Sequence, residues 1–269
     1  MTAVIAGRPF AQVVERRPCH PSARRERERC CVEVNSPIER PDPATYSQAE
    51  QFSIGSQPTW NSPDILTNFV GAAKLMPEAR VIVRNLSPTT SAVSVAVHVS
   101  VSRFGIGFQR IPIGTSTVTL SPSQQQTLLI PLPQSVLNGE QRIGFHVRIE
   151  HPSDPVLINN EGSQIIDAFS TSAQGRSIQT SIRVRNPLNA AQSITLQLLA
   201  TQPGVQVTYT MPPGPFGPFE ERVCMVTIQI ENWLTGGGGT THEREITFVA
   251  RGSDGKVIDG ITFYVAVNS

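Results

Sequence analysis

VIVRNLSPTTSAVSVAVHV, residues Val81–Val99, consists of two strand-like runs separated by a turn. The apolar positions of its second run are Val93, Val95, Val97 and Val99, and small or polar residues separate them. Such a period of two is typical of a strand with one face in a core and the other in water. Leu128–Leu132 and Val226–Ile230 alternate in the same way, so we expect strands there too.

The same stretch is the best-preserved part of an internal repeat. Val83-Arg84-Asn85 recurs as Val184-Arg185-Asn186, 101 residues further along the chain. The same offset aligns Val93, Val95 and Val97 with Ile194, Leu196 and Leu198, and Ser62 and Ile65 with Ser163 and Ile166. An offset of 98 aligns Leu128, Ile130 and Leu132 with Val226, Ile228 and Ile230. Nearly constant offsets in separate strands predict two copies of one domain of about 100 residues, rather than a solenoid of short repeats.

Turn clusters such as LSPTT, LNGEQ and GSDGK separate the apolar runs at the spacing of a sandwich. We therefore predict an all-β fold with two tandem immunoglobulin-like antiparallel sandwiches, at residues 60–165 and 166–269. Residues 1–59 are rich in proline, lack regular periodicity and contain the densest charge cluster, RRPCHPSARRERER. We expect them to form an extended, irregular N-terminal arm.

WNSPDI, VIVRNLSPTTSAVSVAVHV and TVTLSPSQQQTLLIPLP together resemble CARDB-like immunoglobulin-type modules of bacterial proteins. The resemblance covers residues 60–269, and Ser123 stands where such modules usually have a turn glycine. It implies a non-catalytic domain of the kind that accompanies secreted hydrolases and surface proteins. It brings no catalytic residue.

Charge and hydropathy narrow the range of partners. The 22 Lys and Arg residues nearly balance the 21 Asp and Glu residues, so we expect no nucleic-acid partner. No stretch approaches the roughly 18 apolar residues of a spanning helix, so we expect no membrane insertion. The N-terminus lacks the features of a secretory signal, which points to cytoplasmic synthesis or assembly, with non-classical export as the alternative.

The sequence contains no G-x-S-x-G, H-E-x-x-H or Walker motif, so we expect a protein without enzymatic activity or cofactor. His98 and His146 lie within predicted strands, and Cys224 shares the parity of the core residues beside it. The weak candidates for a zinc site are Cys19, His20, Cys30 and Cys31. Adjacent ligands are hard to direct at one tetrahedral ion, so free thiols are the main expectation and an intermolecular disulfide is another alternative.

The arm also contains candidate assembly residues. These are Cys30, Cys31, Val32, Glu33 and Val34, which can form a strand with Val32 and Val34 on one face, and Tyr46, Phe52 and Ile54, which can fill grooves of a neighbour. An extended segment of this kind can add to the edge strand of another sandwich. The alternative is a disordered tail.

We therefore expect a structural or interaction subunit of a bacterial or phage-related assembly, with a homo-oligomer or a larger protein assembly as its partner. The first alternative is an accessory or adhesion module associated with secreted hydrolases or the cell surface. The second is a carbohydrate-binding sandwich, which needs a row of exposed aromatic residues. The chain offers only two tryptophans, Trp60 and Trp233, and three tyrosines for such a row.

Overall fold

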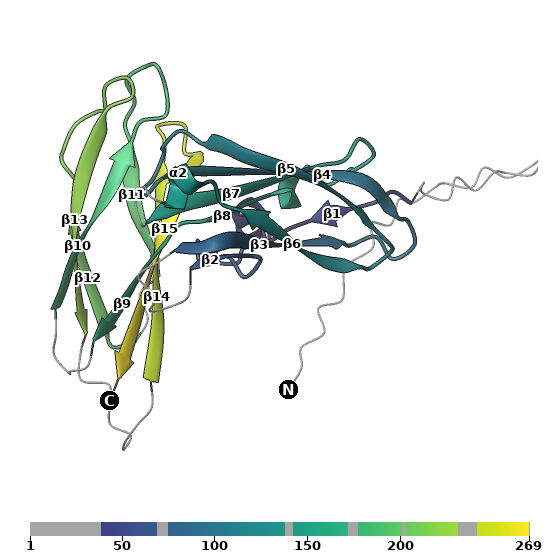
Figure 1. Cartoon of the computed structure of the whole chain (residues 1–269). Coiled ribbons are helices and arrows are strands. Elements are labelled where there is room, and N and C mark those ends of the chain that lie inside the picture. Colours follow the sequence, from purple (N-terminus) through teal and green to yellow (C-terminus); the bar gives the residue numbers. More distant parts are fainter. Residues whose placement is uncertain are drawn as a thin grey trace, which may run out of the picture. The chain divides into compact units, whose positions relative to one another are not determined.

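The structure, a computed structural model, describes residues 39–68, 75–137, 142–171, 177–200, 203–230 and 241–268. The predicted all-β fold is confirmed: antiparallel sheets form two immunoglobulin-like sandwiches, one after the other in the sequence (Figure 1). Within the described ranges, no helix is long and apolar enough to cross a membrane.

The first sandwich is built from two sheets whose strand pairs are all antiparallel. One sheet contains β1 (Pro43–Ala44), β2 (Ile65–Asn68), β3 (Leu75–Asn85) and β6 (Gln125–Pro131). The other contains, in spatial order, β5 (Ile111–Leu120), β4 (Ala92–Arg103), β7 (Ile143–Glu150) and β8 (Glu161–Gln164). The short helices are α1 (Gln48–Ser53), α2 (Gln134–Leu137) and the 3-10 helix η1 (Leu157–Asn159).

The second sandwich also has two sheets. One contains β10 (Ser177–Arg185), β13 (Glu221–Ile230) and β12 (Val205–Thr210) in that order. The other contains β11 (Thr195–Ala200), β14 (Thr241–Arg251), β15 (Val257–Asn268) and β9 (Ile166–Thr171). Strand β9 runs parallel to β15, whereas the other pairs are antiparallel.

The alternating residues fill the two cores as the period of two requires. Val95, Val97 and Val99 are buried in the first sandwich, and Val226 and Ile228 are buried in the second. The cysteine predicted to lie in the core, Cys224, is buried beside them, and burial raises the pKa of its thiol. Each buried aliphatic side chain of this size contributes about 1.5–3 kcal/mol to folding.

One residue of the predicted alternation faces the solvent instead. Val93 is 57% exposed, while its neighbour Ala92 is buried. The register of β4 against β5 shifts between Ala92 and Val95, and Ser94 has a φ of 59°. This bulge reverses the side on which Val93 lies, so Val93 does not correspond to the buried Ile194.

The strand pairing also corrects the offset of 98 residues that aligned Leu128 with Val226. Val81 pairs with Leu128, and Ile182, 101 residues further on, pairs with Cys224. Leu128 therefore corresponds to Cys224 rather than to Val226. A slip of two residues keeps every side chain on the same face, so the alternation could not reveal it.

Asn85 and Asn186 make matching contacts in the two sandwiches. Both are buried, and their side-chain amides donate to carbonyls of the following loop, at Thr90 (2.7 Å) and Ala190 (2.7 Å). Each amide also donates to the turn before the partner strand, at Ser121 (3.1 Å) or Gly217 (2.8 Å). The V-R-N motif thus places one buried asparagine that joins two loops in each sandwich.

The part of the predicted arm from Glu39 onward is not extended. It belongs to the compact unit that runs to the end of the chain. Pro43 and Ala44 pair with β3 as strand β1, and Ser47 caps helix α1 by accepting a hydrogen bond from the Glu50 N–H. The cap and the pairing satisfy backbone groups that an extended arm would leave to water.

Ser123 lies in the turn before β6 with a φ of 57°, in the left-handed region that favours glycine. We expect Ser123→Gly to raise the free energy of unfolding by about 0.5–1 kcal/mol, because glycine removes this backbone strain. Urea unfolding followed by circular dichroism measures the change. Ser121→Gly is the matched control: Ser121 has no positive φ, so glycine there should destabilise the protein instead. A loss of stability in Ser123→Gly would contradict the assignment of strain to this turn.

Candidate protein-interaction site

Strand β10 lies at an edge of its sheet. On one side it pairs with β13 over its whole length. On the other side Ile106, from the first sandwich, forms a parallel bridge with Val184. The Ile106 N–H donates to the Arg183 carbonyl (2.9 Å), and the Arg185 N–H donates to the Ile106 carbonyl (2.9 Å).

The bridge shows which backbone groups of β10 point away from β13. Because strand residues alternate, the groups of Ser177, Gln179 and Ser181 face the same way as those of Arg183 and Arg185. Among the described residues, no backbone hydrogen bond satisfies these three on that side. The part of β10 before the bridge is therefore an open strand edge.

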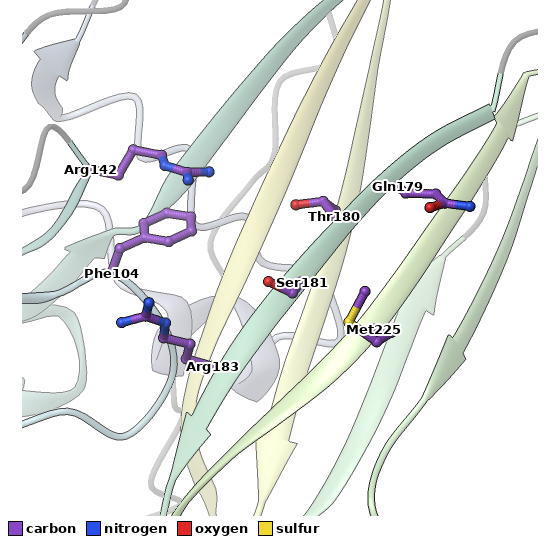
Figure 2. A pocket seen from close by; sticks show the side chains of 7 residues that line it. All are labelled: Phe104, Arg142, Gln179, Thr180, Ser181, Arg183 and Met225. Carbon is purple, nitrogen blue, oxygen red and sulfur yellow. The ribbon is translucent and has the colours of Figure 1, made fainter.

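A groove of about 790 Å³ lies along this open edge (Figure 2). Phe104 and Arg142 of the first sandwich stand on one side of it, as Figure 2 shows. The other lining residues come from β10 and β13 and are Gln179, Thr180, Ser181, Arg183 and Met225. Met225 is 55% exposed, so the groove combines polar backbone with accessible apolar surface.

Two arginines make the groove cationic. Arg142 lies over the ring of Phe104 at 5.3 Å and forms an ion pair with Asp167 (2.5 Å). Burial raises the pKa of the Asp167 carboxyl, and Arg142 partly offsets that effect. The Arg183 guanidinium is 46% exposed and lies 3.9 Å from the Glu221 carboxylate. Both arginines keep enough exposed surface to meet an acidic side chain of a ligand.

Trp60 joins the two sandwiches. It lies between α1 and β2 of the first sandwich in the sequence, yet its side chain is 2% exposed and belongs to the core of the second. Its indole N–H donates to Asp259 Oδ1 (2.7 Å), and its backbone N–H donates to Thr262 Oγ1 (2.8 Å). A Cβ at position 260 would come within 2.6 Å of the indole ring, so only glycine fits there. Since Trp60 is buried, it cannot act as an exposed platform for a sugar.

The carboxyl group beneath Trp60 is unusual. Asp259 is buried, and burial raises its pKa from 3.8 to about 6. The nearby charge of Arg110 and the hydrogen bonds from Gly260 and Trp60 limit this rise. With this pKa, Asp259 stays protonated up to about pH 6 and is mostly ionised at pH 7.

The two strand histidines have different surroundings. His146 is buried, with its ring nitrogens 3.0 Å from Ser102 Oγ and 2.9 Å from Ser163 Oγ. Burial lowers its pKa from 6.5 to about 3, so it is neutral near pH 7. His98 lies at the surface, where its ring contacts Thr115 and Glu150. His146 thus satisfies two buried hydroxyls in the interior of the first sandwich.

The residues predicted for a zinc site or for assembly divide into two groups. Cys19, His20, Cys30, Cys31, Val32, Glu33 and Val34 lie outside the described residues. Tyr46 accepts a hydrogen bond from the Thr59 N–H (2.9 Å), and Phe52 packs against the core of the second sandwich. Tyr46 and Phe52 therefore make contacts within their own chain. Of the three predicted assembly residues that the structure describes, only Ile54, at 65% exposed, stays accessible.

Sequence reasoning did not find the groove residues. Phe104 and Arg142 meet β10 only because the two sandwiches join, which no local pattern shows. One signal was available: Met225 and Val223, both exposed, alternate with the core residues Cys224 and Val226. Apolar residues on the outer face of a strand indicate a surface that can be covered.

Neither a protein-family model nor a curated protein sequence matches the chain. The Escherichia coli alpha-2-macroglobulin activated by porcine elastase aligns over 86% of this chain at 12% identity, with a TM-score of 0.28. The chain spans only 22% of that macroglobulin's length. The CupB6 tip adhesin from Pseudomonas aeruginosa aligns over 76% of this chain and 94% of its own, at 9% identity and a TM-score of 0.22. Similarities at this level support no inference about the function of this chain.

We expect Asp259→Asn to remove a loss of stability that the wild type shows as the pH rises. The folded pKa of Asp259, about 6, lies above its ordinary value of 3.8. Asp259 therefore contributes stability below pH 4 that disappears as the pH rises through 6, by about 3 kcal/mol in total. Asparagine stays neutral and can still accept from Trp60, so the variant should be the more stable protein at pH 7.

Urea unfolding of both proteins at pH 4, 5, 6 and 7 measures this difference, and the comparison cancels the titration of His146. Asp254→Asn is the control, because it removes an exposed carboxyl of the nearby turn, whose pKa is lowered rather than raised. Equal pH profiles for wild type and Asp259→Asn would show that Asp259 does not titrate in this range.

Proposed function

We propose that this protein is a non-enzymatic interaction subunit that assembles with other copies or docks in a larger bacterial or phage-related protein assembly. The observation that carries the proposal is the open edge of β10 in a groove lined by Phe104, Arg142 and Met225. An exposed strand edge pairs readily with an extended segment of another protein. Backbone hydrogen bonds then supply affinity, and the groove side chains supply selectivity.

The joint between the sandwiches supports this function because it fixes the groove in advance. Trp60 and Ile106 are both buried in the core of the second sandwich, although they belong to segments of the first. Burying an indole removes roughly 150–250 Å² from water, which is worth about 4–6 kcal/mol. Because these contacts already fix the groove, binding a segment does not require the free energy of ordering the groove residues.

The accessory or adhesion module is the alternative, and the resemblance to CARDB-like modules fits both proposals. A surface module would bind a partner through the sandwiches alone. An assembly subunit would also need the segment before Glu39. Removing that segment therefore distinguishes the two.

We expect a chain that begins at Glu39 to stay folded but to lose assembly. Starting at Glu39 keeps β1, α1 and the contacts of Tyr46 and Phe52, which a later start would remove. Circular dichroism checks the fold, and light scattering over a concentration series compares the mass of the shortened and full-length proteins. If the shortened protein assembles as the full chain does, the proposed role of the segment before Glu39 fails. If the full chain stays monomeric throughout, assembly with other copies is excluded.

A further inference from the structure

The two sandwiches differ at one strand edge. In the first, β6 pairs with one side of β3, and β1 and β2 pair with the other. Ile65 and Leu66 of β2 lie opposite Val81 and Arg80. The V-R-N offset of 101 carries these two β3 positions onto Ile182 and Ser181 of β10. The covered edge of β3 therefore corresponds to the open edge of β10.

In the second sandwich, the strand that corresponds to β2 does not cover β10. By sequence, Ile65 of β2 corresponds to Ile166 of β9. Strand β9, however, pairs in parallel with β15, in the opposite sheet. Among the described residues, the bridge of Ile106 to Val184 is the only strand pairing on this edge. The second sandwich is thus one strand short beside the groove.

We infer that the arm segment Val32–Val34 of a second copy fills this place as an antiparallel strand on β10. This inference rests on the proposed function and names the site at which the assembly forms. Taking the register of β2 against β3, Val32 would lie opposite Ile182, Glu33 opposite Ser181 and Val34 opposite Thr180.

The side-chain pattern of the segment matches that of β2. In β2, Ile65 and Thr67 are buried and Leu66, between them, is 42% exposed. Val32 and Val34 provide two β-branched side chains at the same spacing, and β-branched residues suit a half-buried strand. Their inward neighbours on β10 are Thr180 and the fully buried Ile182.

The charges of the segment and the groove are complementary. Glu33 would point outward, on the face of β10 that holds Arg183. Diagonal neighbours on adjacent strands lie within reach of long side chains, so the carboxylate can pair with this half-exposed guanidinium. Glu33 is also the only acidic residue within Cys30–Val34.

Chain length assigns the segment to a second copy. Glu39 is fixed beside the loop before β4, where its carbonyl accepts a hydrogen bond from Thr90 Oγ1 (3.1 Å). The groove lies at the other end of β4, beside Phe104, about 36 Å away for a 12-residue strand. Val34 is only five residues from Glu39, which span about 18 Å at most. A chain therefore cannot place its own Val34 in its own groove.

Donor and acceptor are different surfaces, so the contact is head-to-tail. Repeated from copy to copy, such contacts close into rings or continue as open chains, whereas two copies that exchange their segments reciprocally form a symmetric dimer. In each case one arm segment satisfies one open β10 edge.

Two proline variants of the full-length protein test the acceptor edge. Ser181→Pro removes an N–H that faces the groove and leaves the bonds to β13 intact. Thr127→Pro is the matched control, because its N–H faces away from β3 on the exposed edge of β6. We expect Ser181→Pro to weaken assembly at least tenfold in light-scattering titrations, and Thr127→Pro to assemble like wild type. Circular dichroism melts confirm that both are folded.

Charge exchange tests the occupant without changing the backbone. Glu33→Arg and Arg183→Glu should each weaken assembly several-fold, and the double variant should restore it, because only a direct pairing can be rescued. Normal assembly by a folded Ser181→Pro, or loss in Thr127→Pro instead, overturns the assigned edge. Additive losses in the charge variants overturn the assigned segment. If assembly needs residues 1–38 but survives Ser181→Pro, the proposed function stands and only this site falls.

Discussion

The insertion of Trp60 into the second sandwich is the contact on which the other features depend. Its carbonyl accepts a hydrogen bond from the Ile165 N–H (2.9 Å), and the Ile165 carbonyl accepts one from the Thr262 N–H (3.0 Å). Trp60, before β2, and Ile165, after β8, are thus added side by side to a sheet of the second sandwich. Because these two segments of the first sandwich are held in this way, Ile106 and Phe104 are brought against β10. The groove is a consequence of the joint rather than of either sandwich alone.

The same joint accounts for the open edge. Directly after Ile165 the chain continues as β9, whose first residue, Ile166, pairs with Thr262 of β15. Since Ile165 is already bonded to Thr262, the following residues lie along β15 and cannot also cross to β10. In the first sandwich the residue directly before β2, Asp64, instead accepts a hydrogen bond from the Ile82 N–H of β3 (2.8 Å), and β2 pairs with β3. Placing β9 beside β15 strengthens the joint and leaves β10 uncovered.

The alternation of apolar residues predicted which face of its sheet each side chain occupies, and therefore which side chains are buried. The alternation from Val95 to Val99 and from Val226 to Ile230 identified core positions in both sandwiches, because burial follows parity along a strand. It could not detect a shift that leaves every side chain on the same face, such as the two-residue slip in the alignment of β6 with β13. Nor could it show the bulge at Ser94 or the packing of Phe52, since both depend on residues distant in sequence. The sequence could not show the groove for two reasons. The groove residues come from two sandwiches that are distant in sequence, and no repeat in the sequence marks the edge of β10 as open.

An open strand edge can pair with unwanted partners as well as with a ligand, and the residues around β10 oppose such unwanted pairing. Two β10 edges paired directly would bring the Arg183 side chains of two copies close together, beside both Arg142 groups. Like charges across neighbouring strands oppose pairing, and charged residues at edges are a common protection against unwanted association. The bridge from Ile106 shortens the free edge further by occupying the carbonyl of Arg183. A short, cationic edge of this kind rejects copies of itself and favours a short strand that contains a carboxylate, so the features that keep β10 from self-pairing also select its partner.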